Sequence, residues 1–395
     1  MCMRAICPML NCRDSDVADN LESAGADTAN ERVLLRAQAT PGATIDRSVV
    51  DNDISSDLIA QVKAAYAAGR MLAIRGGGTK CWWAEELDRE VLDTAPHSGI
   101  VSYEPTELVL TARAGTRLTD VVAALDSAGQ ALPFEPPMFG ANATLGGAVA
   151  CGVSGPRRPW GGAVRDAVLG VELINGAAER LTFGGQVMKN VAGYDVSRLM
   201  VGARGTLGVL TQISVKVLPK AECEVTCVLQ LERDAALARV VAWNRSPLPL
   251  SATCHVVDRL SVRLSGAHAA VEEAAARIGG VRSDDSAEFW CALRDQRSAF
   301  FDGAGELWRF SLPHAARMPR CSGEWLIEWA GAQRWLRSAT PLGDRPFVEA
   351  SALGGHAQRW RPSWQSTPLP AAQRELQVRL QQAFDPRGVF RAGRL

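Results

Sequence analysis

The 395-residue sequence contains no uninterrupted run of about 18 to 20 apolar residues, the length that a membrane-spanning helix needs. Its first residues also lack the basic and then apolar layout of a secretory signal peptide. Both absences predict a cytoplasmic protein without a transmembrane segment. Histidine is scarce too, with five residues in the whole chain, which leaves few imidazoles for acid–base chemistry.

The chain has no excess of charge of either sign. Lys plus Arg and Asp plus Glu both number 43, so no long-range attraction to nucleic acid is expected. A hydrophobic fraction of 47% and a charged fraction of 22% are ordinary for globular proteins. Because one core seldom organises a chain of this length, we predict two or three domains.

The ten cysteines do not have the spacing of a metal site. Four residues separate each neighbouring pair among Cys2, Cys7 and Cys12, and three residues separate Cys223 from Cys227. Zinc sites and bacterial ferredoxin clusters use cysteine pairs that are two residues apart. The sequence therefore predicts free or buried thiols, no metal ion and no iron–sulfur cluster within this chain.

Glycine, by contrast, is concentrated in three segments. Arg75-Gly76-Gly77-Gly78-Thr79-Lys80 follows an apolar run, and further segments cover 140–162 and 205–211. Backbone amides of glycine approach an anion or a flat ring closely, because no Cβ intervenes. The first segment is no Walker A motif, since Thr79 precedes Lys80, and no G-x-G-x-x-G run follows a strand. The three segments together predict one extended dinucleotide ligand.

Apolar spacing and turn residues divide the chain into parts. Residues 1–48 are rich in Asp, Asn, Ser and Ala, which predicts a disordered extension. Residues 49–220 are predicted to form a first domain that begins with a helix, with Ser55 or Ser56 as its N-cap and Gly69 just after its last residue. Within it, Asn175-Gly176 predicts a hairpin turn, and Pro219 ends the last alternating strand.

A second domain is predicted over residues 221–383, before a tail of residues 384–395. The expected order is strand, helix, strand, strand, helix, strand, which is typical of a ferredoxin-like α+β fold. The expected bounds are 225–231, 234–243, 252–257, 260–264, 267–278 and 307–312. Eight of the eleven tryptophans lie after residue 222. We expect them to cover a substrate or to contact another subunit, or else to fill a core.

Five segments form a recognisable set of motifs, namely Tyr103–Glu107, Leu132–Pro137, Gly155–Trp160, Val187–Asp195 and Gly205–Val209. Together they resemble those of the FAD-binding subunits of glycolate oxidases, which belong to the vanillyl-alcohol-oxidase or PCMH-type flavoproteins. The similarity extends over about residues 54–395. The resemblance implies an FAD-binding domain of two α+β subdomains, followed by a smaller ferredoxin-like domain and a tail that returns to the FAD domain.

The resemblance also implies which residues bind FAD. These are Arg75, Gly76, Gly77, Gly78, Thr79, Lys80, Thr144, Gly146, Gly147, Gly152, Gly205, Thr206, Gly208 and Val209. Covalently flavinylated relatives carry a histidine directly after the first glycines, where this chain has Thr79, so non-covalent FAD is expected. The closing motif departs from the family, with Arg391-Ala392-Gly393 in place of Asn-Pro-Gly, although the Arg394 contact can remain.

The catalytic residues stay unknown from the sequence. Oxidation of a 2-hydroxy acid needs a base near the hydroxyl and a cation at the carboxylate. His356 and Arg359 are the nearest match, with solvent exposure or a structural role as the alternative. The family's companion catalytic flavoprotein carries a segment of the H-x-G-D-G-N type, which this chain lacks. Lys189, Tyr194, Arg198 and Arg157-Arg158 are further candidates, each with an equally good structural explanation.

Two functions fit these residues. In the first, the chain is an FAD subunit that oxidises glycolate, with D-lactate as a second substrate, and passes electrons to a partner iron–sulfur subunit. In the second, it is a non-catalytic electron-transfer or assembly subunit, and a partner flavoprotein subunit performs the oxidation. Either complex could hold the chain at the inner face of the membrane. A stand-alone oxidase that uses oxygen is a more distant third.

Overall fold

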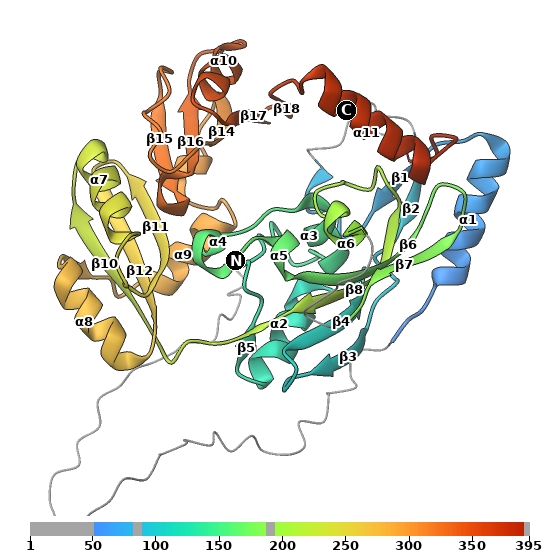
Figure 1. Ribbon diagram of the computed structural model, residues 1–395, viewed down its shortest axis with the longest axis horizontal. Coiled ribbons are helices and arrows are strands. Elements are labelled where there is room, and N and C mark those ends of the chain that lie inside the picture. The colour runs from blue at the N-terminus through green and yellow to red at the C-terminus, as the bar shows by residue number, and fades with distance from the viewer. Residues whose placement is uncertain (1–50, 82–88, 187–193, 391–395) are drawn as a thin grey trace, which may run out of the picture. The chain divides into compact units, whose positions relative to one another are not determined.

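The computed structural model describes residues 51–81, 89–186 and 194–390, all within one compact unit that extends from Ala43 to Leu395 (Figure 1). Helices and strands are mixed throughout, which confirms the α+β class. The predicted extension of residues 1–48 lies outside the described residues. Among the helices that are described, none is both long enough and apolar enough to cross a bilayer.

The terms first domain and second domain denote the predicted parts 49–220 and 221–383 of this one compact unit, and helix α1 (Ser55–Ala68) begins the first of them. Its buried Leu58, Val62 and Ala65 recur at helical spacing, and Gly69 ends the helix with a φ of 64°. The buried side chains pack on a parallel pair of strands, β1 (Leu72–Arg75) and β2 (Glu90–Asp93). The chain that connects these two strands begins with the glycine-rich loop.

The end of the chain packs against the same pair of strands. The N–H of Leu72 donates to the carbonyl of Val389 at 2.8 Å, and Phe390 is buried in the cluster around α1. The Asp385 carboxylate accepts the N–H groups of Val389 and Phe390 at 2.8 and 2.7 Å, which fixes the turn before them. The closing motif at residues 391–394 lies outside the described residues.

A five-stranded antiparallel sheet forms the second subdomain. Its order is β3-β4-β8-β6-β7. The bounds are β3 (Ile100–Glu104), β4 (Val109–Arg113), β6 (Val168–Ile174), β7 (Arg180–Gly184) and β8 (Val209–Lys216), and a separate short pair joins β5 (Gln130–Ala131) to β9 (Leu218–Pro219). The helices are α2 (Leu118–Ser127), α3 (Leu145–Cys151), α4 (Arg158–Gly161), α5 (Val164–Ala167) and α6 (Val196–Leu199). Apolar side chains of α2, α3 and α5 share one core with the sheet.

The hairpin predicted at Asn175 is present, but its turn is longer than two residues. Ile174 pairs with Arg180, so residues 175–179 form the connection. The side-chain Oδ1 of Asn175 accepts the N–H groups of Ala177 and Glu179 at 3.0 and 2.9 Å. The asparagine therefore stabilises the turn by replacing backbone acceptors.

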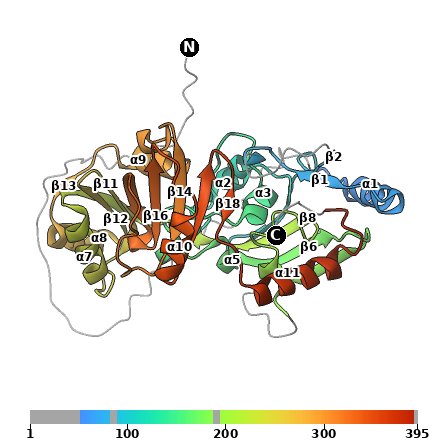
Figure 2. The same ribbon diagram turned by 90° about the horizontal axis from the view of Figure 1, so that it is seen from above.

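A nine-stranded sheet forms the second domain, in the order β13-β10-β12-β11-β15-β16-β14-β17-β18. Its first part is β10 (Cys223–Gln230), α7 (Arg233–Trp243), β11 (Leu250–Val256), β12 (Arg259–Gly266), α8 (His268–Ile278) and β13 (Val281–Arg282). Helices α7 and α8 pack on one face of these strands (Figure 2). This part has the predicted ferredoxin-like strand order, with all neighbours antiparallel.

The prediction of the last strand of this unit was wrong. Residues 307–312 were expected to be the fourth strand, but Val281–Arg282 pairs at that edge instead. The predicted segment becomes β14 (Glu306–Ser311), in an extension at the opposite edge. The other elements are α9 (Ser286–Arg294), β15 (Glu324–Glu328), β16 (Gln333–Ser338), α10 (Arg345–Ala352), β17 (His356–Arg361), β18 (Gln365–Ser366) and α11 (Ala371–Phe384), with short 3-10 turns at Ala299–Phe301 and Trp329–Gly331. One edge of β11 pairs with β12 and the other edge pairs with β15. The sheet therefore continues beyond the ferredoxin-like unit.

Polar contacts join the two domains. The Arg263 guanidinium donates to the Glu135 carboxylate at 2.7 Å, and the Arg157 guanidinium donates to the Ser265 hydroxyl at 2.6 Å. The indole N–H of Trp329 donates to the carbonyl of Gly155 at 3.0 Å. Two of the motif segments, 132–137 and 155–160, therefore hold the second domain in place.

Candidate functional site

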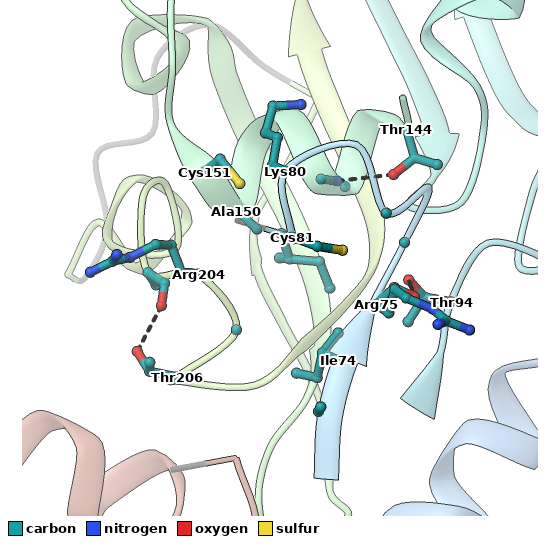
Figure 3. A pocket seen from close by; sticks show the side chains of 18 of the residues that line it. Ile74, Arg75, Lys80, Cys81, Thr94, Thr144, Ala150, Cys151, Arg204 and Thr206 are labelled. Carbon is teal, nitrogen blue, oxygen red and sulfur yellow. Dashed lines mark hydrogen bonds between the residues drawn. The ribbon is translucent and has the colours of Figure 1, made fainter. Parts of the chain in front are cut away.

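A cavity of about 970 Å³ lies beside the glycine-rich loop (Figure 3). Its walls come from segments far apart in the sequence, namely 72–81, 144–151, 200–210 and 362–364, together with Arg89, Thr94, Ala114 and Phe390. This volume is at the upper end of the range of about 300 to 1,000 Å³ for small-molecule sites. The cavity is large enough for an extended ligand rather than a small metabolite alone.

Two structural features explain why this loop consists of glycine residues. A Cβ on Gly77 would lie 1.5 Å from the carbonyl oxygen of Asn142, and a Cβ on Gly76 would lie 2.7 Å from the Thr144 hydroxyl. The third glycine, Gly78, has a φ of 69°, which side chains disfavour. The loop therefore packs directly on segment 142–144, and all three of its glycines line the cavity.

Helix α3 forms a second wall. The Thr144 side chain accepts the N–H of Gly147 at 3.1 Å and so caps the helix (Figure 3). A Cβ on Gly146 would lie 2.7 Å from the Cβ of Ala114, so this glycine allows α3 to approach the five-stranded sheet. Gly152 does not line the cavity; it ends α3 with a φ of 64°. The positive φ at the end of the helix explains why this position is glycine.

The segment around Gly205 forms a third wall. Gly205, Thr206 and Gly208 line the cavity, and the Thr206 hydroxyl donates to the carbonyl of Ala203 at 2.7 Å. Val209 does not line it, because its side chain is fully buried in the cluster around α1. Twelve of the predicted cofactor residues thus meet at one cavity, and Gly152 and Val209 support its walls from behind.

Cationic and thiol side chains occupy part of the cavity wall. Lys80, Arg204 and Cys151 all line it, and no described ion pair joins either cation to a carboxylate. Enclosure by protein lowers the pKa of Lys80 and of Arg204 and raises the pKa of Cys151, because desolvation disfavours each charged form. Unpaired cations in a partly desolvated wall favour an anionic ligand.

The Trp364 side chain closes part of the cavity from the second domain. The Arg204 guanidinium stacks on its ring at 4.0 Å from the centroid. Arg359 supports this loop, since its guanidinium donates to the carbonyl and hydroxyl oxygens of Ser363 at 3.1 and 2.9 Å. Arg359 also pairs with Glu306 at 3.5 Å. It therefore positions a wall of the cavity without lining it.

The other catalytic candidates lie away from the cavity. His356 is exposed at the start of β17 and does not line it. Tyr194 is 95% exposed, and Arg198 pairs with Asp195 at 3.2 Å. Lys189 lies outside the described residues, as does most of the Val187–Asp195 motif. Among the described residues, no predicted base lines the ligand cavity.

A smaller cavity of about 520 Å³ shares the glycine-rich loop as a wall. Arg75, Gly76, Gly77, Gly78, Cys81 and Thr144 line both cavities. Arg117 and Asn142 line only the smaller one. The loop therefore separates two spaces, and Arg75, Arg117 and Asp93 bring charges of both signs to the smaller one.

Sequence reasoning missed several residues of the larger cavity. The principal ones are Cys81, Arg89, Thr94, Ala114, Ala150, Cys151, Met200, Ala203, Arg204, Trp364 and Phe390. Arg204 and Cys151 stand next to predicted motifs, so adjacency could have indicated them. Trp364 has no such signal, because it is more than 150 residues away from the three glycine-rich segments in the sequence.

Comparisons with known proteins agree with this geometry. Residues 49–184 match a family described as an FAD binding domain. The chain is 45% identical over 344 residues to the glycolate oxidase subunit GlcE of Escherichia coli (strain K12), covering 87% of this chain and 97% of that one. It is 32% identical over 236 residues to the glycolate oxidase subunit GlcD of Bacillus subtilis (strain 168), covering 59% of this chain and 50% of that one. A solved structure of an alkyldihydroxyacetonephosphate synthase has a TM-score of 0.60 at 13% identity, covering 86% and 76% of the two chains, and shows the same fold.

Fold, cavity and family match together define an FAD-binding flavoprotein of the oxidoreductase type. Within that class, the chain belongs to the family of the glycolate oxidase subunit GlcE. The resemblance stated from the sequence motifs is therefore confirmed, and FAD is the cofactor. The residues present fit this cofactor, because glycine amides and unpaired cations suit a diphosphate and small residues leave room for a flat ring.

Proposed function

We propose that this chain is the FAD-carrying subunit of a complex that oxidises glycolate, and D-lactate as a related short 2-hydroxy acid, to the 2-oxo acid. A catalytic flavoprotein subunit and an iron–sulfur subunit complete the complex, and the latter receives the electrons. The observation that carries the proposal is the cavity of about 970 Å³, in which twelve predicted cofactor residues meet. The 45% identity to a glycolate oxidase subunit supports the substrate class.

Within this proposal, bound FAD supplies an acceptor for the two electrons of the hydroxy acid. The chain's own residues hold and enclose it. Gly76, Gly77 and Gly78 present backbone amides to the diphosphate, and Lys80 adds positive charge. Trp364 and Ser363 restrict access of water from the side of the second domain. The binding is non-covalent, as expected from Thr79.

The same cavity favours the accessory role as a second candidate function. None of its described lining residues is His, Asp, Glu or Tyr. The side chains there that could accept a proton are Lys80, Cys81 and Cys151. Removal of a proton from a hydroxy acid usually requires a base whose pKa is near the working pH. A partner flavoprotein would then perform the oxidation, and this chain would carry electrons or support assembly.

The cofactor assignment is tested by Gly77→Asp. The new side chain has no space beside Asn142, and its carboxylate repels a diphosphate. We expect the purified variant to lose the yellow colour and the FAD content of the unsubstituted protein. Gly185→Asp is the matched control, because a Cβ there meets no atom within 4 Å. Retention of stoichiometric FAD by folded Gly77→Asp would contradict the assignment.

The catalytic role is tested by anaerobic mixing of the FAD-loaded chain with glycolate. Rapid bleaching of the flavin absorbance by the isolated chain supports its own oxidation of the acid. Bleaching that requires added partner subunits supports the accessory role. If the reconstituted complex oxidises neither glycolate nor D-lactate, the substrate class is wrong, and FAD binding is unaffected by that result.

A further inference from the structure

Three metal-ligating side chains meet in the second domain, away from the FAD cavity. The Sγ of Cys223, a ring nitrogen of His268 and a carboxylate oxygen of Glu272 all lie within 4.8 Å of one another. None of these residues lines either cavity described above. The function proposed for the chain leaves this cluster unexplained.

The fold brings the three residues together from two elements. His268 is the first residue of α8 and Glu272 is four positions later, so both side chains lie on the same face of the helix. Cys223 is the first residue of β10 and pairs with Gly266, two residues before α8. The start of the strand and the first turn of the helix are therefore held side by side by the sheet.

We propose that Cys223, His268 and Glu272 form a zinc site. A thiolate, an imidazole and a carboxylate are the three ligand types that zinc prefers. Together they supply two negative charges against the two positive charges of the ion. A water molecule or an additional side chain completes the tetrahedron.

The spacing suits this ion. Zinc–ligand bonds of about 2.0 to 2.3 Å place the ligand atoms of a tetrahedral site roughly 3.3 to 3.8 Å apart. The three side chains are exposed or partly exposed, so small rotations bring their ligand atoms closer by the required distance, about 1 Å.

Arg282 completes the surroundings of the site. Its guanidinium donates to both carboxylate oxygens of Glu272, with an Nη1 to Oε1 distance of 3.1 Å. Carboxylates that bind metals are commonly held by such an outer hydrogen bond. One oxygen can bind zinc while the other stays with Arg282. The carboxylate of Glu222 lies at the same helix start, where it accepts the N–H of His268 at 3.4 Å.

A zinc ion at this position would link β10, at the beginning of the second domain, to helix α8. Cys223 follows the domain edge near Pro219 by four residues. We therefore assign a structural role to the ion, as a link between β10 and α8.

The test uses the full-length, FAD-loaded chain after removal of metals with a chelator. Zinc is titrated against a chromophoric competitor, and cobalt is used as a spectroscopic substitute. We expect one tightly bound equivalent and a thiolate-to-cobalt absorption band in the near ultraviolet. Cys223→Ser should abolish the band and weaken zinc binding at least about a hundredfold, since outer-shell losses alone reach that size.

Matched variants separate the site from other ligands in the chain. Glu272→Gln should weaken zinc binding, whereas Glu273→Gln, the exposed neighbour on another face of α8, should leave it unchanged. His268→Ala removes the third ligand and should also weaken zinc binding. Unchanged zinc affinity in Cys223→Ser and His268→Ala, or no stoichiometric binding by the starting protein, would overturn the proposal. FAD content, measured in the same samples, is expected to stay constant.

Discussion

The two domains use their interior space in opposite ways. In the first, Gly77 and Gly146 lack room for a Cβ, which would lie 1.5 and 2.7 Å from neighbouring atoms, and their small size leaves a cavity open in front of them. In the second, Trp308, Trp335 and Trp360 are buried and fill the space on the sheet. The first domain therefore holds a ligand, and the second contributes only residues 362–364 to the cavity wall.

Charge follows the same division. Lys80 and Arg204 in the first domain have no described carboxylate partner and face the cavity. In the second domain, Arg309 lies over the rings of Trp329, Trp335 and Trp360, and donates to Gln333 at 2.5 Å. Gln333 in turn donates to Glu328 at 2.5 Å. The Arg309 guanidinium is therefore held by groups within the second domain, whereas Lys80 and Arg204 at the cavity are available to a ligand.

The largest effect on stability is expected when the second domain loses a buried hydrogen-bond acceptor. Glu328→Leu removes the oxygen that accepts from Trp335 at 2.7 Å and from Gln333, and both donors are buried. Leaving two buried donors unpaired should lower the free energy of unfolding by about 3 kcal/mol. Chemical denaturation measures this change. Glu328→Gln keeps an acceptor oxygen and should lose much less, and equal losses in both variants would contradict the explanation.

A smaller effect is expected when the cavity wall gains a methyl group. Gly146→Ala places a Cβ against Ala114 and should cost about 2 kcal/mol of stability, with weaker FAD binding. Gly147→Ala is the control for stability on the next residue, because its Cβ would meet only the Thr144 hydroxyl, at 3.1 Å. Thermal unfolding with and without FAD separates the two effects. Equal behaviour of the two variants would mean that the close approach of α3 is unimportant.

Substitutions that loosen the loop of residues 362–364, which the second domain contributes to the cavity wall, should weaken FAD binding modestly. Arg359→Met removes the two hydrogen bonds to Ser363 and leaves Trp364 less firmly placed. We expect FAD to bind roughly fivefold more weakly, equivalent to about 1 kcal/mol. Ser363→Ala removes only the hydrogen bond to the hydroxyl. Its affinity for FAD should lie between those of Arg359→Met and the unsubstituted protein. Fluorescence titration with FAD measures all three, and an unchanged affinity in Arg359→Met would exclude this role.

The smallest effect concerns pH. Burial lowers the pKa of His97 below its usual 6.5, and its Nδ1 accepts the N–H of Ile54 at 3.1 Å, as a neutral imidazole does. The unfolded chain therefore binds a proton more readily than the folded one. The stability from His97 is fully present above pH 6.5 and is lost as the pH falls through its lowered pKa. Denaturation between pH 7.5 and 5.5 should show a smaller decline in His97→Asn.

Glu328 in the second domain responds in the opposite direction. Burial raises the pKa of its carboxyl above the usual 4.5. The folded chain then binds a proton more readily than the unfolded one, so the related stability is present below pH 4.5 and is lost as the pH rises. Acidification from neutral pH should thus weaken the first domain through His97 while it relieves the buried carboxylate of the second. A Glu328→Gln variant that keeps the full pH response would contradict this assignment.

Local patterns predicted the two helices at the start of the second domain closely, but no element after residue 312. The expected helices at 234–243 and 267–278 match α7 (Arg233–Trp243) and α8 (His268–Ile278) within one residue at each end. Apolar spacing and the glycines that end helices depend on neighbours a few residues away, which the sequence displays directly. The fourth strand of the ferredoxin-like unit was misplaced because the pairing edge of β10 is set by distant contacts, not by the propensity of residues 307–312.

The cavity was only partly predictable. The glycine-rich segments and the family resemblance together identified twelve lining residues, because close approach of backbone leaves a compositional signal. Trp364 carries no such signal, and His356, chosen for its chemistry, lies elsewhere. The residues Cys223, His268 and Glu272 likewise have no recognised spacing, and β10 with α8 brings them together.

The sequence alone determined the α+β class, the family and the cofactor, because glycine segments and motifs are properties of adjacent residues. The tertiary structure decided which side chains face the cavity, how Arg359 supports Trp364, and how the ferredoxin-like unit grows into nine strands. Those outcomes depend on packing and pairing between residues that are tens to hundreds of positions apart, where free energy is set by contacts that no local pattern records.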